Sequence, residues 1–171
     1  MNTLTALSEW IEQEPAVAVS MIESISEEFR ILARISDRTL IELGDELDLC
    51  RTHVEIMSRR RGRDYDLIVE GVDAHDLVPP AIFHTLVENA ITHDDSKRAR
   101  VALSLRATHE GSRVRYVFES PCDHRETDWV EGTGMRYVRA RLQESFGADW
   151  SLSAGPADGV WRTEIEFPRK P

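Results

Sequence analysis

Two short segments combine residue types that could hold a metal ion and a phosphate. The first is H-T-L-V-E-N-A-I-T-H, residues 84–93, where Glu88 and Asn89 stand side by side in a helical pattern, although asparagine is a poor helix former. An asparagine oxygen can ligate Mg²⁺, which takes few protein ligands and shares the phosphates of a substrate. A neighbouring glutamate could orient or deprotonate an attacking group. The pair therefore predicts a site for a magnesium-bound phosphate compound.

A zinc site on the same helix is disfavoured by the spacing of its histidines. His84 and Glu88 are one turn apart, but His93 lies nine residues after His84, about half a revolution round the helix. The H-E-x-x-H pattern of zinc proteases is absent. The spacing therefore argues against metalloprotease chemistry.

The second segment is Gly132-Thr133-Gly134, which precedes a predicted helix. Glycines at such a junction let backbone N–H groups approach phosphates, and the helix N-terminus adds a favourable field. Taken alone, the segment could equally be a flexible turn. Arg136 and Arg139 follow on the helix, where each could also belong to a solvated face.

Composition excludes several classes of function. A net charge of -10 over 171 residues argues against a nucleic-acid surface. Cys50 and Cys122 form no disulfide framework and no cysteine-based zinc site. The two lysines, Lys97 and Lys170, follow no glycine-rich loop, so a P-loop is excluded. The sequence contains neither an apolar run long enough to span a membrane nor a signal peptide, and we expect a cytoplasmic chain.

Hydrophobic residues recur at alternating four- and three-residue steps in the first third of the chain, a pattern typical of paired helices. One such stripe consists of Ala18, Ile22, Ile25, Phe29 and Leu32. A second occupies residues 43–57 and ends in Arg59-Arg60-Arg61 and Gly62. Two interpretations stay open: ordinary core packing, or a helical hairpin that also dimerises.

The remainder of the chain alternates between strand and helix patterns. Residues 64–71 read as a strand, and Pro79-Pro80 suit the start of a helix with an apolar stripe. Two alternating strands follow, A-R-V-A-L-S-L-R-A and R-V-R-Y-V-F-E, joined by the turn T-H-E-G-S. After the helix that begins near Gly132, the turn G-P-A-D-G leads to a last strand, V-W-R-T-E-I-E-F. This order predicts an α+β sandwich, with a mixed sheet and helices on one face.

The order of these elements resembles the Bergerat ATP-binding fold, and the motifs resemble those of LytS-type sensor histidine kinases. V-P-P-A-I-F-H-T-L-V-E-N-A-I-T-H is similar to the N box of that family, and G-T-G-M-R-Y-V-R-A-R-L-Q-E-S-F-G to its second glycine box. L-I-E-L-G-D-E-L-D-L-C-R-T-H-V-E-I-M-S-R-R resembles the stretch before the N box. N-T-L-T-A-L-S-E-W-I-E-Q-E-P-A-V-A resembles the segment just after the phospho-acceptor motif.

The resemblance implies ATP and Mg²⁺ as cofactors and assigns roles to individual positions. Asn89 matches the Mg²⁺ ligand, and Glu88 matches the adjacent catalytic acidic residue. His93 matches the end of the N box near the phosphates. The remaining cofactor-binding positions that it implies are Gly132, Gly134 and Arg136. Where the family carries D-x-G-x-G to hold adenine, this sequence has F-E-S-P-C-D-H, so Glu119, Ser120 and Asp123 are the candidate substitutes.

The resemblance also implies two domains and two protein partners. Residues 1–38 would be a remnant of the dimerisation and phospho-acceptor helices, and residues 39–171 the ATP-binding catalytic domain. The acceptor histidine is expected upstream of Met1, so this chain alone should not phosphorylate itself. The partners would be a response regulator and, through the N-terminal helices, a second copy of the chain. Two alternatives remain: a non-catalytic regulatory module that has lost adenine binding, and an anti-sigma-type serine kinase of the same fold.

Overall fold

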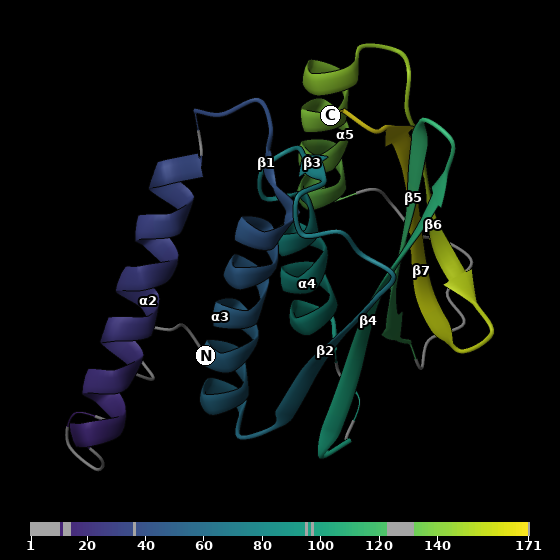
Figure 1. Ribbon diagram of the computed structural model, residues 1–171. Helices are drawn as coiled ribbons and strands as arrows, with labels where there is room; N and C mark the ends of the chain where they lie inside the picture. Colours follow the sequence, from purple (N-terminus) through teal and green to yellow (C-terminus); the bar gives the residue numbers. More distant parts are fainter. Residues whose placement is uncertain are drawn as a thin grey trace.

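The computed structural model describes residues 11, 15–35, 37–94, 96, 98–122 and 132–170, to which the structural statements below refer. Helices α3 (Leu43–Arg61), α4 (Ile82–Thr92) and α5 (Thr133–Phe146) cover one face of a five-stranded mixed sheet. Helix α2 (Pro15–Ile35) lies outside this layer, beside α3 (Figure 1). The predicted α+β sandwich is therefore confirmed. The segment 2–18 lies mostly outside the described residues, and Asp123 lies wholly outside them.

The order of the strands in the sheet is β2-β4-β5-β7-β6. Strand β2 pairs in parallel with β4, and the other neighbours are antiparallel. The strands are β2 (Asp64–Glu70), β4 (Arg100–Glu110), β5 (Arg113–Pro121), β6 (Ser151–Ala157) and β7 (Val160–Pro168). A separate two-stranded pair joins β1 (Ile41–Glu42) to β3 (Leu77–Val78), directly before α3 and α4.

The core lies between the sheet and the helices. Alternate residues of each strand point to the same face of the sheet, and one of these two sets packs against the helices. On β5, Val114, Tyr116 and Phe118 are buried, and their register partners on β7 are Phe167, Ile165 and Thr163. The apolar stripe predicted for α4 is confirmed: Phe83, Leu86, Val87 and Ile91 are all buried. The sequence pattern therefore placed the inward faces of these elements correctly.

Strand β6 corrects one sequence prediction. G-P-A-D-G, residues 155–159, was expected to be a turn, but residues 155–157 belong to β6. The turn contains only Asp158 and Gly159, with φ angles of 51° and 83°. Proline is tolerated in β6 because this strand lies at the edge of the sheet and pairs with β7 alone. Because of the proline, the sequence pattern predicted a turn at residues that belong to an edge strand.

Helix α4 begins two residues later than the proline pair indicates, and its cap comes from another helix. Its N-cap residue, Ala81, adopts a left-handed conformation with φ 60°. The fully buried carboxylate of Glu46, on α3, accepts hydrogen bonds from the backbone N–H groups of Ala81 (2.7 Å), Phe83 (2.8 Å) and His84 (3.0 Å). Burial raises the pKa of Glu46, and the three N–H donors oppose that rise. Glu46 therefore fixes the start of α4 against α3.

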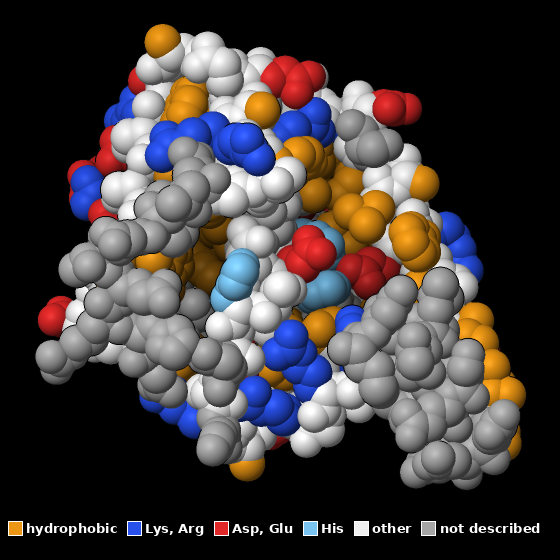
Figure 2. Space-filling view, turned by 180° about the vertical axis from the view of Figure 1, so that it is seen from behind, with side chains coloured by type: hydrophobic (Ala, Val, Ile, Leu, Met, Phe, Trp, Pro, Cys, Tyr) orange, Lys and Arg blue, Asp and Glu red, His pale blue; other side chains and the backbone are white. Residues whose placement is uncertain are grey.

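Helix α2 packs on α3 and leaves apolar side chains uncovered. Ile31 and Ile35 are buried, whereas Val19, Ile22 and Phe29 are 56%, 46% and 67% exposed. In Figure 2 hydrophobic side chains follow the right-hand edge, where α2 lies. The predicted stripe from Ala18 to Leu32 is thus divided: Ala18 is buried, and Ile22 and Phe29 face outward. Among the described residues, no helix combines the length and apolar character that crossing a membrane requires.

Replacing Glu46 with alanine should lower the free energy of unfolding by about 3 kcal/mol or more, because three buried N–H groups lose their charged acceptor. Urea denaturation followed by circular dichroism measures this loss. Glu55→Ala is the matched control, since Glu55 is exposed on the same helix and pairs with Arg59 at the surface. It should change stability by less than about 0.5 kcal/mol. Equal losses in the two variants would contradict the capping role.

Candidate functional site

The two segments singled out in the sequence meet where α4 packs against α5. A Cβ atom placed on Gly134 would lie 2.5 Å from Asn89 Nδ2 and 2.8 Å from Asn89 Oδ1. The amide of Asn89 therefore lies directly against the first turn of α5, and only a glycine leaves room for it. Gly134 is the second residue of that helix. The structure thus places the side chain that was predicted to ligate Mg²⁺ beside a helix N-terminus.

The predicted residues of α4 differ in their exposure. Asn89 is half-buried beside α5, whereas its neighbour Glu88 is exposed. His93 forms the C-cap of α4; it is exposed, and its backbone N–H donates to the carbonyl oxygen of Asn89 (3.0 Å). Glu88 and His93 can therefore reach a ligand that lies over the helix, while Asn89 is held between the two helices.

The first turn of α5 offers backbone donors. Its N-cap residue is Gly132, in an extended conformation with φ -78° and ψ 179°. Because glycine has no side chain, the N-cap residue cannot occupy the N–H groups of the first turn. The exposed side chain of Arg136 reaches back to the hydroxyl of Thr133 (3.3 Å). Backbone N–H groups, the helix field and a guanidinium are therefore available to an anion at this end of α5.

The two described candidates for adenine binding lie on opposite faces of β5. Glu119 accepts a hydrogen bond from Arg162 Nε (2.7 Å), its register partner on β7, and alternation places this pair on the face away from the helices. Ser120 is buried on the helix-facing side. Of the two, only Ser120 shares the side of the sheet on which α4 and α5 lie.

Thr163 is a residue whose potential role the sequence did not reveal. It is 1% exposed, and its Oγ1 has no hydrogen-bond partner among the described residues. On β7 it pairs with Phe118, two residues before Ser120 on the same face of β5. A buried hydroxyl without a partner costs about 1–3 kcal/mol. The signal was a polar residue at an inward position of the alternating strand V-W-R-T-E-I-E-F.

A second cluster of titratable side chains also escaped sequence analysis. Glu28, His53 and His84 come from α2, α3 and α4, and their polar atoms meet at short distances. Within α4, residue spacing relates His84 only to Glu88 and His93. No spacing rule connects three residues that come from three separate helices.

Comparisons with known proteins find similarity to histidine kinases. The family model described as "Histidine kinase" matches residues 1–65. Sensor histidine kinase BtsS of Escherichia coli (strain K12) is 27% identical over 98% of this chain and 30% of its own length. An uncharacterized sensor-like histidine kinase of Staphylococcus epidermidis is 27% identical over 63% of this chain and 21% of its own length. The chain thus spans about 30% or less of the length of these relatives.

Solved structures extend the comparison to the fold. The histidine kinase domain of the Erythrobacter litoralis EL346 blue-light activated histidine kinase superposes with a TM-score of 0.56 at 18% identity, covering 98% of this chain and 88% of that one. The catalytic domain of histidine kinase ThkA gives a TM-score of 0.55 at 14% identity, covering 77% of this chain and 97% of that one.

The fold is that of histidine kinase catalytic domains. The family model and the relatives add similarity in sequence to histidine kinases, over residues 1–65 and over 98% of the chain respectively. The predicted fold is therefore confirmed, the similarity to histidine kinases agrees with the predicted resemblance, and the narrower LytS-type assignment stays a prediction.

Gly134→Ala should displace the Asn89 side chain, because the added methyl group would overlap the Asn89 amide. Stability should change little, since the amide can rotate away and alanine is favoured over glycine in a helix by up to about 1 kcal/mol. The side-chain amide signals of Asn89 in a ¹⁵N-resolved NMR spectrum report the displacement.

Gly132→Ala is the matched control for this substitution. A Cβ atom on Gly132 meets nothing within 4 Å, so the Asn89 signals should keep their positions. Shifts of equal size in both variants, or none in Gly134→Ala, would show that Asn89 does not lie against α5.

Proposed function

We propose that this chain binds Mg²⁺·ATP between α4 and α5 and forms the ATP-binding catalytic region of a LytS-type sensor histidine kinase. The observation that carries the proposal is the contact of Asn89 with Gly134. It sets an oxygen donor suited to Mg²⁺ beside a helix N-terminus whose N-cap residue is a glycine, an arrangement suited to phosphate. Neither feature alone would distinguish a nucleotide site from an ordinary helix contact.

Each residue of the site has a chemical role in this proposal. The Asn89 Oδ1 atom ligates Mg²⁺, and the first turn of α5, with Arg136, binds the phosphate oxygens. Glu88 orients or deprotonates the attacking group from its exposed position, and His93 lies near the phosphates. The bound nucleotide supplies the γ-phosphoryl group. The contribution of the protein is mainly positioning and charge neutralisation, as is general for phosphoryl transfer.

Hydroxyl groups take the place of the missing adenine-binding carboxylate in this proposal. Ser120 and Thr163 are buried on the helix-facing side of β5 and β7, and Thr163 Oγ1 lacks a partner among the described residues. Either hydroxyl could donate to a ring nitrogen or accept from the amino group of adenine. Glu119 is less suited, because it is paired with Arg162 on the opposite face.

We further propose that the phosphoryl group passes to a histidine and then to a response regulator, and that the chain works as a homodimer. The proposed division at residues 38 and 39 is supported by the place of α3, which packs with α4 and β2 in the catalytic layer, whereas α2 lies outside it. The uncovered Val19, Ile22 and Phe29 give α2 an apolar surface for a second copy.

ATP should bind in a Mg²⁺-dependent manner, and Asn89→Ala should weaken the affinity at least about tenfold, because the metal loses its protein oxygen. Isothermal titration with ATP, with and without Mg²⁺, measures both effects. Asn89→Asp is the matched control: it keeps an oxygen donor and should retain most of the affinity.

The same titration separates the alternatives. Unchanged affinity in a folded Asn89→Ala variant would remove Asn89 from the metal site. Absence of any nucleotide binding by the unsubstituted chain would favour the non-catalytic regulatory module.

The chain should self-associate through α2, and Phe29→Asp should reduce self-association, since it places a charge on an apolar side chain that is 67% exposed. Light scattering over a range of protein concentrations measures the molar mass. Glu23→Lys, a charge change at another exposed position of α2, is the control and should leave the mass unchanged. A monomer at high concentration, for both the unsubstituted chain and Phe29→Asp, would refute a dimer through this surface.

A further inference from the structure

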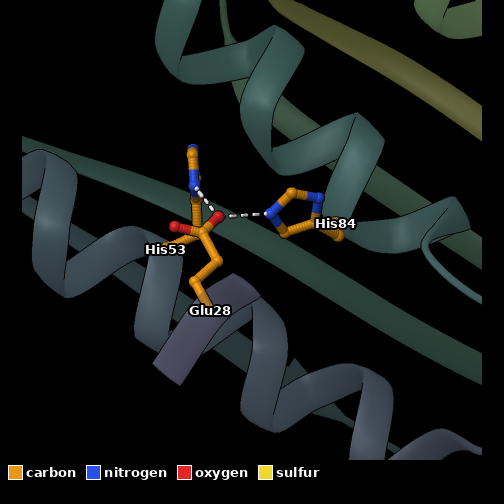
Figure 3. A group of neighbouring side chains, drawn as sticks. All are labelled: Glu28, His53 and His84. Atoms are coloured by element: carbon orange, nitrogen blue, oxygen red, sulfur yellow. Dashed lines mark hydrogen bonds and ion pairs between the residues drawn. The ribbon is translucent and has the colours of Figure 1, made fainter. Parts of the chain in front are cut away.

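The cluster of Glu28, His53 and His84 joins three helices through one oxygen atom. Glu28 Oε1 lies 2.7 Å from His53 Nδ1 and 2.9 Å from His84 Nε2. Figure 3 shows both rings directed at this oxygen, Glu28 coming from α2 and the histidines from α3 and α4. The ring centroids are 4.9 Å apart, and the rings are nearly perpendicular. Two imidazoles and a carboxylate therefore converge on one point.

The side chains of the cluster are mostly buried, but each is partly exposed to solvent. The side chains of Glu28, His53 and His84 are 15%, 11% and 9% exposed. Figure 2 shows histidine and acidic side chains together near the middle of the face opposite to Figure 1. A small ion can reach such a site without an opening of the core.

The charge of the cluster suits a cation. Burial raises the pKa of Glu28, but the hydrogen bonds and charges of His53 and His84 outweigh this effect and lower the pKa to about 2. Glu28 is therefore ionised at neutral pH. A metal ion would bind the carboxylate form of Glu28 and the neutral form of both imidazoles.

The donor set is one that transition metals prefer. Imidazole nitrogen and carboxylate oxygen together suit Zn²⁺ and its neighbours, whereas Mg²⁺ takes oxygen ligands and water. All three donor atoms lie within 4.8 Å of one another. Ligands at 2.0–2.1 Å from a tetrahedral ion are about 3.3 Å apart, so the two hydrogen-bonded contacts need to open by roughly 0.5 Å.

We propose that Glu28 Oε1, His53 Nδ1 and His84 Nε2 bind a divalent transition-metal ion of the Zn²⁺ class, which fastens α2 to α3 and α4. Three protein ligands leave at least one position of the ion to water. The site is separate from the proposed Mg²⁺·ATP site: it uses imidazole ligands and different residues, and it does not depend on nucleotide binding.

The environment of His53 limits the affinity of the proposed site for a metal ion. His53 Nε2 is buried and has no hydrogen-bond partner among the described residues. Coordination at Nδ1 moves the proton of the neutral ring to Nε2, where it stays unpaired. Metal-ligating histidines usually donate this second proton to an acceptor, and loss of such a partner weakens binding. The site should therefore hold its ion reversibly and less tightly than a closed structural zinc site.

Of the three helices that the metal would join, α2 would gain most in the stability of its packing. Among the described side chains of this helix, the buried apolar ones are Ala18, Ile31 and Ile35, so a bond through Glu28 would add substantially to the attachment that they provide. The stability of that attachment would then depend on the concentration of free metal.

Titration of the full 171-residue chain with Co²⁺ tests the site, because Co²⁺ bound to nitrogen and oxygen donors at low coordination number gives a visible absorption band. The chain must carry no histidine tag. We expect a saturable band that Zn²⁺ displaces. His84→Gln and Glu28→Gln preserve side-chain size and should abolish the band and raise the Zn²⁺ Kd at least about tenfold. His75→Gln, at an exposed histidine elsewhere, is the control and should leave both unchanged.

Amide hydrogen exchange gives a second measurement, independent of the spectrum. Zn²⁺ should slow exchange along α2 in the unsubstituted chain and not in Glu28→Gln, a variant that alters only the outer helix. A missing Co²⁺ band in the unsubstituted chain would overturn the proposal. So would a band of equal affinity in His84→Gln and Glu28→Gln, or protection of α2 by Zn²⁺ in Glu28→Gln.

Discussion

The position of α4 depends on one buried carboxylate. Glu46 is inaccessible to solvent and accepts three backbone N–H bonds at the start of α4. A buried charge is tolerated only where hydrogen bonds and an opposing field replace water, and a helix N-terminus supplies both. Because the bonds run to Ala81, Phe83 and His84, the axial position of α4 is set relative to α3. Because the helix is rigid, the positions of the side chains further along α4 are set by the same contact.

Two of those side chains contact different helices. His84 and Asn89 are five residues apart, which places them about 140° apart round the helix. Asn89 consequently lies against the first turn of α5, and His84 meets Glu28 and His53 on the side of α2 and α3. A single rigid element thus connects the proposed nucleotide site to the attachment of the outer helix. Rotation of α4 that suits one contact must alter the other.

Patterns within one element were predictable from the sequence, and contacts between elements were not. The apolar stripe of α4 and the alternation along β5 and β7 follow from local order and are confirmed, whereas the roles implied for Glu88 and Asn89 follow from a motif and stay predictions. The cap by Glu46 spans 35 or more residues, and the metal-binding cluster joins α2, α3 and α4, so neither has a spacing that a pattern could reveal. Strand β6 was missed because proline is disfavoured in strands, so Pro156 indicated a turn. Proline is tolerated there because β6 is an edge strand, and the sequence pattern does not show which strand lies at the edge.

Docking of α2 and pairing of two copies do not compete for the same surface. Glu28 and Phe29 are consecutive, so they point about 100° apart on α2. Glu28 is held by the two histidines with Ile31 and Ile35 buried nearby on the helix, whereas Phe29, with Ile22 and Val19, faces away from the sheet-bearing layer. A second copy could therefore cover the apolar side without breaking the polar attachment.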